Sequence, residues 1–432
     1  MIMASPSAMA KSLRERYDEL RVSYAPQRGR ADADPEDPFI VRVTQLLLSY
    51  GVDCRASDIH IEPTASGGRI RYRIDGFLHE MLQVPPEVRD PLVRSIKVKA
   101  SMTTDAVGRS KPQDGRIDFE SNGRKLDLRL SSFPTLYGDV MAIRILDRSA
   151  PLLTMEQLGF PQSMLKEFAA LTRRPNGLIL VTGPANSGKT TTLYGVLHKL
   201  RSPHIKIVTL EDPVEYQLEG IDQATINSAV GLTFASGLRA ILRQDANVIL
   251  VGEIRDKETA EIGIRAALTG HLVLSTLHTR HSCGAVTRLI DMGIEPHLLV
   301  ASINGILAQR LIRVLCPKCK EPDPLAAKTV IRILTQETGS APPNLDLGGV
   351  SRGKGCVACN MTGYQGRTGV FELLSFTDEL KRLVLDRDSG RLYKAAVLAG
   401  MRTMVLDGIE KITQGVTTVE EVLRVIGESE DF

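Results

Sequence analysis

The stretch VTGPANSGKTTTLY, residues 181–194, decides how the second half of this chain folds. Four residues separate Gly183 from Gly188, and Lys189 and Thr190 follow at once, which is the spacing of a phosphate-binding loop. Glycines at these positions let backbone N–H groups approach phosphate oxygens closely. A chance match in a glycine-containing turn is the alternative, but the flanking sequence argues against it.

The flanking residues predict a buried strand before the loop and a helix after it. The strand is the apolar GLILVT at 177–182, and the helix is TTTLYGVLHKL at 190–200, whose positive N-terminal end faces the anion. Lys189 is expected to reach the β- and γ-phosphates of ATP, and Thr190 to offer its hydroxyl to Mg²⁺. The predicted nucleotide-binding residues of the loop are Gly183, Pro184, Ala185, Asn186, Ser187, Gly188, Lys189, Thr190 and Thr191.

Hydrolysis also requires acidic groups at neighbouring strand ends, and two segments supply them. In NVILVGEIRD an apolar strand ends near Glu253, whose carboxylate can hold Mg²⁺ directly or through water. In VTLEDPVEY, Glu211 and Asp212 follow another predicted strand, which ends at the proline after them. Both acids are therefore predicted to project from the edge of the sheet. There, one of them can orient the attacking water. Solvated loop acids or a helix cap are the alternative for any single one of them.

Two histidines flank a further predicted strand. In GHLVLSTLHT, His271 and His278 lie near its two ends. Either histidine alone is more often a hydrogen-bonded structural residue than a catalyst. Next to phosphates, one of them can sense the γ position.

Length and composition limit the classes of protein to consider. At 432 residues, with 43% apolar and 24% charged residues, the chain has room for two or three soluble domains. A formal net charge of +3 gives no support for an extended basic surface that binds nucleic acid, although a local basic face is still possible. The sequence has no run of about 18 apolar residues and no signal-peptide pattern, so we expect a cytoplasmic protein whose membrane contact, if any, is peripheral.

Four of the six cysteines form two C-x-x-C pairs. These are Cys316 with Cys319 and Cys356 with Cys359. Two such pairs favour a tetrahedral structural Zn²⁺ site over a redox pair or disulfides in a cytosolic protein. The remaining Cys54 and Cys283 are expected to be small buried residues.

The pattern along the chain predicts three parts. Residues 1–37 are polar, with a helical pattern over KSLRERYDELR and a linker at ADADPEDP, and are too short to fold alone. Residues 38–149 show short alternating runs and a helix over PLVRSIKVKA, which predicts a small α+β domain. Residues 150–432 alternate strands (LILVT, KIVTLED, NVILVGE, HLVLSTLH) with helices, which predicts a mostly parallel sheet with the phosphate loop at a strand's carboxyl end. Within this part we expect the cysteine-bearing insert at 315–361 and a helical C-terminal part at 370–432.

Taken together, these motifs resemble the type II/type IV secretion assembly ATPases, the family of the general secretion pathway protein E and of the pilus-assembly ATPases. The resemblance is carried by ASDIHIEP, KPQDGRI, GPANSGKTTTLY, LEDPVEY, GLRAILRQDANVILVGEIRD, TGHLVLSTLHT and the two cysteine pairs. It covers the chain from about residue 38 to its end. It implies an α/β, RecA-like ATPase domain preceded by a small PAS-like α+β domain, with a tetracysteine zinc insert. TFASGLRAILRQD and AVTRLIDMGIEP are more similar to the secretion branch than to the pilus branch.

The resemblance implies roles for residues already singled out. Glu253 matches the magnesium-side glutamate and Glu211 the water-positioning acid. His271 and His278 match the histidine box, which implies that His271 binds the nucleotide and that His278 is catalytic. The phosphate-loop lysine and threonine match as well.

It also implies roles that the residues alone do not suggest. Arg129 and Arg144, in predicted strands of the small domain, match arginines that contact the nucleotide, and Arg239 and Arg243 match a second arginine pair. From the residues alone, all four are surface or salt-bridged arginines.

The sequence departs from the family pattern at two points. The phosphate loop has Ala185 and Asn186 where the family usually has Thr-Gly; because asparagine tolerates positive φ better than most residues, we expect the loop to close. We also expect the chain to lack the N-terminal domain that docks family members onto their membrane platform, so the resemblance does not identify its docking surface.

The family implies a homohexameric ring, peripheral to the inner membrane and in contact with the secretion platform proteins, with no nucleic acid. ATP hydrolysis would change the angle between the two domains and drive assembly of a pilin-like fibre, in type II secretion or, as the alternative, in type IV pilus assembly. Two rivals from other classes stay open. A nucleic-acid motor would be stimulated by DNA or RNA, and a nucleotide-gated module would bind ATP without releasing phosphate.

Overall fold

The structure, a computed structural model, describes residues 6–23, 36–105, 111–147, 152–339, 345–359, 361–386 and 389–427. The chain forms two units. The first contains Met1–Pro151, Leu315–Glu321 and Gly353–Gly366, and the second contains Leu152–Val314, Pro322–Arg352 and Arg367–Phe432. Residues 31–35 of the predicted linker lie outside the described residues.

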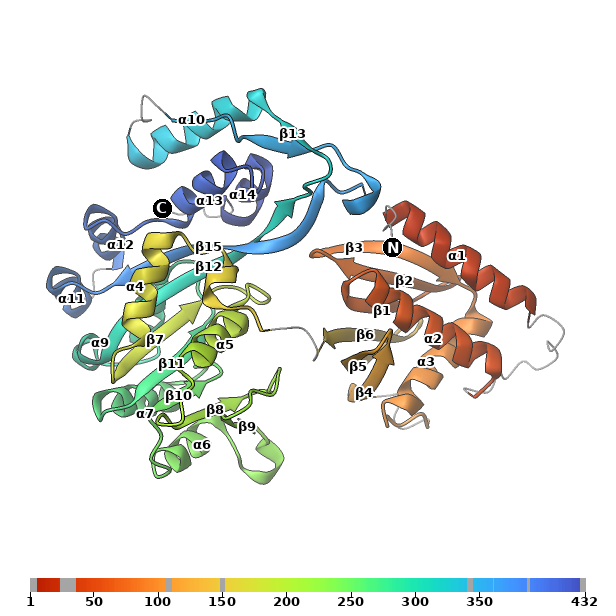
Figure 1. The fold of residues 1–432 in the computed structure, drawn as a ribbon. Coiled ribbons are helices and arrows are strands. Elements are labelled where there is room, and N and C mark those ends of the chain that lie inside the picture. The colour runs from red at the N-terminus through yellow and green to blue at the C-terminus, as the bar shows by residue number, and fades with distance from the viewer. Residues whose placement is uncertain are drawn as a thin grey trace. The chain divides into compact units, whose positions relative to one another are not determined.

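The first unit is built on a six-stranded antiparallel sheet with strand order β3-β2-β1-β6-β5-β4 (Figure 1). Its elements in chain order are α1 (Pro6–Ser23), α2 (Pro38–Asp53), β1 (Ala56–Thr64), β2 (Gly67–Ile74), β3 (Phe77–Val84), α3 (Pro86–Lys99), β4 (Gln113–Ser121), β5 (Arg124–Thr135) and β6 (Gly138–Asp147). Alternate strand residues pack into one core with the helices. Whether the sheet is of PAS type stays a prediction.

The N-terminal helix belongs to this unit, although the sequence pattern sets it apart as an extension. Met9, Leu13 and Tyr17, spaced four residues apart, lie on one side of α1 and are buried in the core of the unit. The helical pattern over KSLRERYDELR is confirmed, and its apolar stripe explains why α1 packs against the small domain.

The second unit is built on a seven-stranded sheet with order β15-β12-β7-β11-β10-β8-β9, in which the pairs from β12 to β9 are parallel. Its central elements are η3 (Met155–Leu158), α4 (Gln162–Thr172), β7 (Gly177–Thr182), α5 (Lys189–Leu200), β8 (Ile207–Glu211), β9 (Asp222–Thr225), η4 (Ser228–Val230), α6 (Phe234–Ile241), β10 (Val248–Val251), α7 (Lys257–Leu268) and β11 (Leu272–Leu277). The elements that follow are α8 (Ser282–Asp291), α9 (Pro296–Ser302), β12 (Ile303–Leu315), β13 (Lys320–Pro322), α10 (Pro324–Thr338), β14 (Ser351–Gly353), η5 (Val357–Cys359), β15 (Tyr364–Ser375), α11 (Asp378–Leu385), α12 (Ser389–Leu398), α13 (Met404–Thr413) and α14 (Val419–Ile426).

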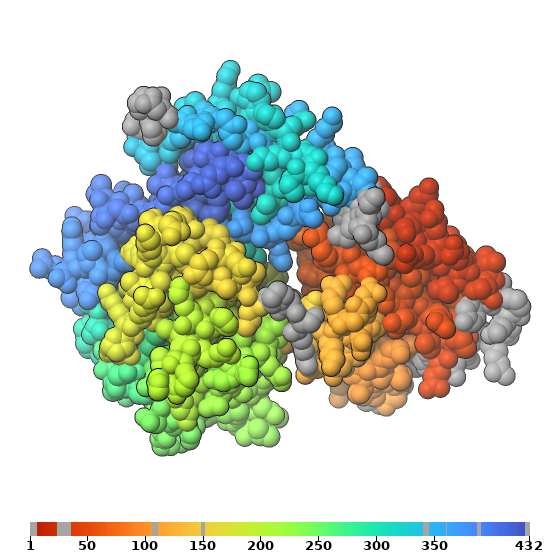
Figure 2. Space-filling model, in the orientation of Figure 1, coloured from red at the N-terminus to blue at the C-terminus, as the bar shows by residue number. Residues whose placement is uncertain are grey.

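Helices cover both faces of this sheet, which confirms the predicted parallel α/β architecture. On β7, Leu178 and Leu180 enter one core, and Ile179 and Val181 enter the other. The first core also contains residues of α6 to α9, and the second contains residues of α4 and α5. Strands buried on both faces read as continuous apolar runs, which is why LILVT and the other three strands are recognisable in the sequence. The space-filling view shows the outer face of both units in the same orientation (Figure 2).

The C-terminal part is less helical than predicted. Residues 364–375 form β15 beside β12, because the apolar run VFELL is buried in the sheet. Helices α10, α13 and α14 then share a small core of their own. No helix in the described ranges is both long and apolar enough to span a bilayer.

The cysteine pairs lie outside the parallel sheet, and their segments group with the first unit and not with the predicted ATPase domain. Strand β12 has 13 residues but pairs with β7 only over 303–308, so its far end extends beyond β7 and leads to Cys316. Cys54 and Cys283 are buried, as predicted, and burial raises the pKa of each thiol to about 12.

Candidate nucleotide-binding and hydrolysis site

The phosphate loop joins β7 to α5 at the carboxyl edge of the parallel sheet. Gly183 has a φ of 155°, and a Cβ there would lie 2.5 Å from the carbonyl oxygen of Gln309. Asn186 has a φ of 61°, in the left-handed region that glycine usually occupies. The prediction that the loop closes with an asparagine at this position is therefore confirmed.

Lys189 lies across the loop. Its ammonium donates hydrogen bonds to the carbonyl oxygens of Gly183 and Pro184, each at 2.8 Å. Burial lowers the pKa of Lys189 to about 8, and the nearby carboxylate of Glu253 opposes part of that shift. Thr190 follows it in the first turn of α5, with its side chain exposed. The positive charge is thus placed where the phosphates of a nucleotide would lie.

Nucleotide affinity is expected to fall as the pH rises through about 8, the pKa of Lys189. Above that pH the free protein holds a neutral amine, and phosphate binding must first restore the proton. Between pH 7 and pH 9 the dissociation constant for Mg-ATP should rise about tenfold, as measured by isothermal titration calorimetry. A constant affinity over this range would contradict the placement of Lys189 at the phosphates.

Gln309 of β12 braces the loop, and the sequence analysis did not single it out. Its side-chain N–H donates to the carbonyl oxygen of Ser187 at 2.7 Å, and its side-chain oxygen accepts from the Thr192 hydroxyl at 2.9 Å. The sequence holds a signal for this role, since a glutamine inside the apolar run ILAQRLI must find hydrogen-bond partners once the strand is buried.

Glu253 and His278 meet at the same sheet edge, after β10 and β11. One oxygen of Glu253 lies 3.5 Å from Nε2 of His278, and the other pairs with Arg255. Burial and the charge of Lys189 lower the pKa of His278. Arg255, which also lies 3.5 Å from Asp212, is a further residue that sequence reasoning missed. The structure brings Lys189, Glu253 and His278 together as the sequence predicts.

Glu211 does not project from the sheet edge, and this part of the prediction is wrong. Its side chain is buried, and its oxygens accept hydrogen bonds from the hydroxyls of Tyr194 and Thr209 and from the amide of Gln223. As the last residue of β8, Glu211 keeps the alternation of the strand and shares a face with Thr209 two positions earlier. Asp212 is the exposed acid of this pair.

His271 lies at the opposite edge of the sheet from the phosphate loop, contrary to the nucleotide-binding role predicted for it. It precedes β11, whereas His278 follows that strand, and a six-residue strand spans about 20 Å. Its Nδ1 lies 3.1 Å from the carbonyl oxygen of Ala266, near the end of α7. The sequence shows that the two histidines flank a strand but not that the site uses one end of it.

Arg239 and Arg243 are associated with helix α6 and not with the phosphate loop. Arg239 pairs with Glu258 of α7, and Arg243 donates to the carbonyl oxygen of Arg239 at 2.8 Å. Both side chains belong to exposed hydrogen bonds. A contact of these arginines with a nucleotide stays a prediction.

Arg129 and Arg144 lie in the first unit, directly opposite each other on β5 and β6. Their neighbours Leu128, Leu130 and Ile143 are buried in the core, so the two arginines are on the other face of the sheet. The structure places the pair side by side, and its contact with a nucleotide also stays a prediction.

A cavity of about 440 Å³ adjoins the phosphate loop within the second unit. Loop residues 184–187 form part of its lining, together with the basic side chains of Arg280, Arg310 and Arg424. The guanidinium of Arg424 is held in turn by Glu421 of the same helix.

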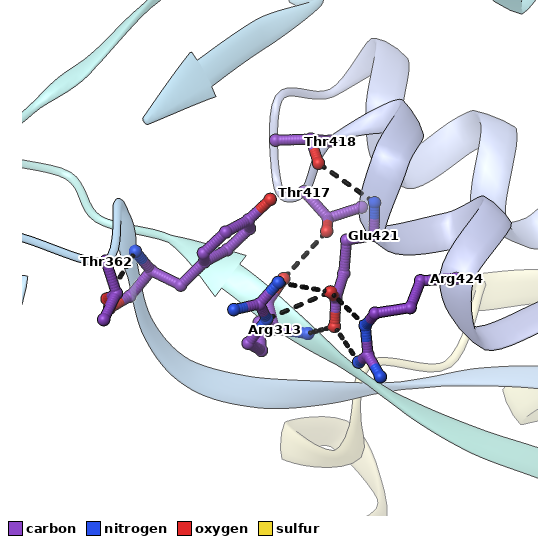
Figure 3. Close-up of polar contacts among 7 residues, drawn as sticks. Arg313, Thr362, Thr417, Thr418, Glu421 and Arg424 are labelled. Atoms are coloured by element: carbon purple, nitrogen blue, oxygen red, sulfur yellow. Dashed lines mark hydrogen bonds and ion pairs between the residues drawn. The ribbon is translucent and has the colours of Figure 1, made fainter. Parts of the chain in front are cut away.

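Glu421 clamps α14 to β12 (Figure 3) and also holds Arg424, which lines this cavity. Its buried carboxylate accepts from the backbone N–H of Arg313 at 3.0 Å and from the guanidinium groups of Arg313 and Arg424, each at 2.7 Å. Thr418 caps the helix by accepting from the Glu421 N–H, and Thr417 donates to the Arg313 carbonyl oxygen. One carboxylate thus fixes the C-terminal helix to the central sheet.

Glu421→Gln is expected to lower the free energy of unfolding of the second unit by about 3 kcal/mol, because it leaves partly buried Arg313 without its counter-charge. Chemical denaturation of the full chain measures this. Glu420→Gln, an exposed neighbour on the same helix, should change stability by less than about 0.5 kcal/mol. Equal stability of the two variants would contradict the clamp.

The four predicted zinc ligands come together within the first unit, namely Cys316, Cys319, Cys356 and Cys359. Their Sγ atoms all lie within 4.8 Å of one another, with three pairs at 3.7 to 3.8 Å. A Zn–S distance of about 2.3 Å gives tetrahedral edges of about 3.8 Å, so this donor set fits Zn²⁺. The backbone N–H groups of Cys356 and Gly363 donate hydrogen bonds to the Cys359 sulfur, each at 3.2 Å.

The purified chain is expected to carry close to one Zn²⁺ per molecule. Cys316→Ser or Cys359→Ser should release the metal and lower the melting temperature, while phosphate release per folded molecule persists, because the cysteines take no part in the proposed chemistry. Elemental analysis with melting curves measures both effects, and Cys54→Ser is the control that should retain the metal. Metal-free protein after purification under reducing conditions would refute the site.

This chain is similar to known secretion-system and pilus proteins. The family described as "Type II/IV secretion system protein" matches residues 33–424. The "Type II secretion system protein E" of Pseudomonas aeruginosa is 46% identical over 393 residues, which cover 91% of this chain and 76% of that protein. The "Type IV pilus assembly ATPase PilB" of Myxococcus xanthus is 44% identical over 390 residues, which cover 90% of this chain and 68% of that protein.

Solved structures show the same fold. The pilus retraction motor PilT with bound ADP is 25% identical, with a TM-score of 0.59 and coverage of 88% of this chain and 95% of that one. The Legionella pneumophila ATPase DotB is 19% identical, with a TM-score of 0.66, and the match covers 93% of this chain and 98% of that one. Because the family matches most of the sequence and the two relatives above share 44% and 46% identity with it, this chain belongs to the type II/IV secretion system protein family.

Proposed function

We propose that this chain is an ATPase that powers protein secretion through a type II secretion system by driving pseudopilus assembly. The observation that carries the proposal is the single sheet edge at which Lys189, Glu253 and His278 meet. The name of the P. aeruginosa relative places that protein in type II secretion, and we extend this role to the present chain. The PilB relative makes type IV pilus assembly the second candidate.

In the proposed reaction the chain binds ATP at the loop and positions water at the γ-phosphate. Loop N–H groups and Lys189 hold the phosphates and stabilise the charge that develops on them. Thr190 and Glu253 would hold Mg²⁺, which neutralises charge on the phosphate oxygens. Glu211, the water-positioning acid implied by the family, would first have to release Tyr194 and Thr209.

Arginines from outside the loop complete the proposal. Arg129 and Arg144 would stabilise the charge that develops on the γ-phosphate in the transition state. Arg239 and Arg243, exposed near α6, would reach the nucleotide of a neighbouring subunit in a homohexameric ring. We further propose that this ring works at the cytoplasmic side of the inner membrane, with the secretion platform proteins as partners.

The test in cells replaces the chromosomal gene by one encoding Glu253→Gln and measures exported proteins in the medium and pili on the surface. Loss of exported proteins with normal pili supports type II secretion, and loss of pili supports the second candidate. Immunoblotting controls for the amount of the variant chain. Normal export together with normal pili would contradict both candidates.

A further inference from the structure

One face of the six-stranded sheet carries a regular set of paired arginines and carboxylates. On β5, Leu126, Leu128 and Leu130 are buried in the core, so Asp127 and Arg129 are on the opposite face. We call this face the charged face. It is defined here by Asp58, Glu62, Arg69, Arg71, Arg73, Arg116, Asp127, Arg129 and Arg144.

Three carboxylates of the charged face each contact two arginines. The pairs are Glu62 with Arg69 (2.8 Å) and Arg71 (3.1 Å), Asp58 with Arg73 (3.5 Å) and Arg144 (3.3 Å), and Asp127 with Arg116 (2.5 Å) and Arg129 (3.8 Å). The same arrangement, one acid in ion pairs with two arginines, therefore occurs three times on this face.

The strand register places two of these arginines directly opposite each other. Arg129 of β5 lies directly opposite Arg144 of β6, and Arg144 lies directly opposite Asp58 of β1. Like charges directly opposite each other destabilise a sheet, so this arginine pair requires compensation by acids or by a bound anion. Asp58 compensates Arg144, and Asp127 compensates Arg129.

Asp127 has an environment unlike that of an ordinary surface acid. It is 2% exposed although it lies on the face away from the hydrophobic core, where Arg116 and Arg129 contact it. Burying a carboxylate is costly unless charged partners satisfy it, so Asp127 and its two arginines constrain one another. Asp127 therefore restrains Arg129 before any phosphate binds.

We infer that Asp58 and Asp127 are positioning residues that hold Arg144 and Arg129 side by side for the γ-phosphate. This inference rests on the proposed function, in which the two arginines stabilise that phosphate. Because each acid is shared between two arginines, each group of one carboxylate and two guanidinium groups keeps a net charge of +1 that can attract the ligand.

The test is a double-mutant cycle in the full chain. Asp127→Asn is expected to lower kcat about tenfold and to change the KM for ATP by less than about threefold. Because Asp127 acts through Arg129, Asp127→Asn combined with Arg129→Ala should be no slower than Arg129→Ala alone, whereas its effect should multiply with that of Arg144→Ala. Asp58→Asn should show the reverse pattern, with its effect absorbed by Arg144→Ala.

Glu62→Gln is the matched control, since it removes a carboxylate that also bridges two arginines on this face but contacts neither Arg129 nor Arg144. It should keep wild-type turnover. An equal loss in Glu62→Gln and Asp127→Asn, or a lower melting temperature of Asp127→Asn with unchanged turnover per folded molecule, would overturn the inference. If Arg129→Ala and Arg144→Ala themselves keep full turnover, the proposed function of the arginines fails first, and the inference fails with it.

Discussion

Lys189→Ala should reduce ATP turnover by roughly 10³ or more, the largest effect expected of any single substitution in this chain. The ammonium lies over the loop, hydrogen-bonded to the carbonyl oxygens of Gly183 and Pro184, and a nucleotide would replace these contacts with phosphate oxygens. Its loss removes charge stabilisation from bound ATP and from the transition state, so affinity should fall together with turnover. Phosphate release and nucleotide titration measure the two effects separately.

Lys199→Ala is the matched control for this substitution. Lys199 lies at the other end of α5 and pairs with Glu156 in an exposed ion pair at 2.9 Å. Exposed ion pairs of this kind contribute little to the stability of a protein, so turnover should stay within about twofold of wild type. Comparable losses in the two variants would point to damage to α5 and not to a lost phosphate contact.

Arg129→Ala and Arg144→Ala should each cut turnover by roughly 10² while nucleotide affinity stays within about tenfold. An arginine that acts on the γ-phosphate stabilises charge that develops in the transition state, and its removal spares the contacts of the loop itself. Steady-state kinetics and nucleotide titration of well-folded variants measure this. A purely structural role predicts a lower melting temperature with unchanged turnover per folded molecule.

Mixed rings can show whose nucleotide these arginines serve. Lys189→Ala subunits and Arg144→Ala subunits are each expected to be nearly inactive alone. Recovery of turnover on mixing requires that an intact arginine of one subunit act on an intact loop of its neighbour. Without recovery in rings shown to be mixed, the arginines act within their own subunit.

The sequence predicts the phosphate loop and its strands well because the signals are local. A buried strand, a glycine-rich turn and a helix occur within the stretch 177–200. A parallel strand that is buried on both faces consists of consecutive apolar residues, which are easy to recognise in a sequence. Glu253 follows such a run directly, and parallel strands end at one edge, so its meeting with Lys189 follows from topology. The two cysteine pairs are recognised from spacing alone.

Other features depend on side-chain contacts and on strand geometry that the local sequence pattern does not show. Glu211 turns away from the sheet edge because Tyr194 and Thr209 satisfy it, and Gln309 reaches the loop from a strand more than a hundred residues later. His271 matches a family motif, yet the direction of β11 places it at the far edge. The arginine pair of the charged face becomes visible only when the register of β5 against β6 is known.

The most direct test of hydrolysis is phosphate release from Mg-ATP by the purified wild-type chain over a range of protein concentrations, with Lys189→Ala measured beside it and the assembly state followed by sizing. A ring-forming ATPase should release phosphate well above the Lys189→Ala level, and its activity per chain should rise as rings assemble. Tight ATP binding with no release above that level at any concentration would identify a nucleotide-gated module instead and would contradict the proposed motor.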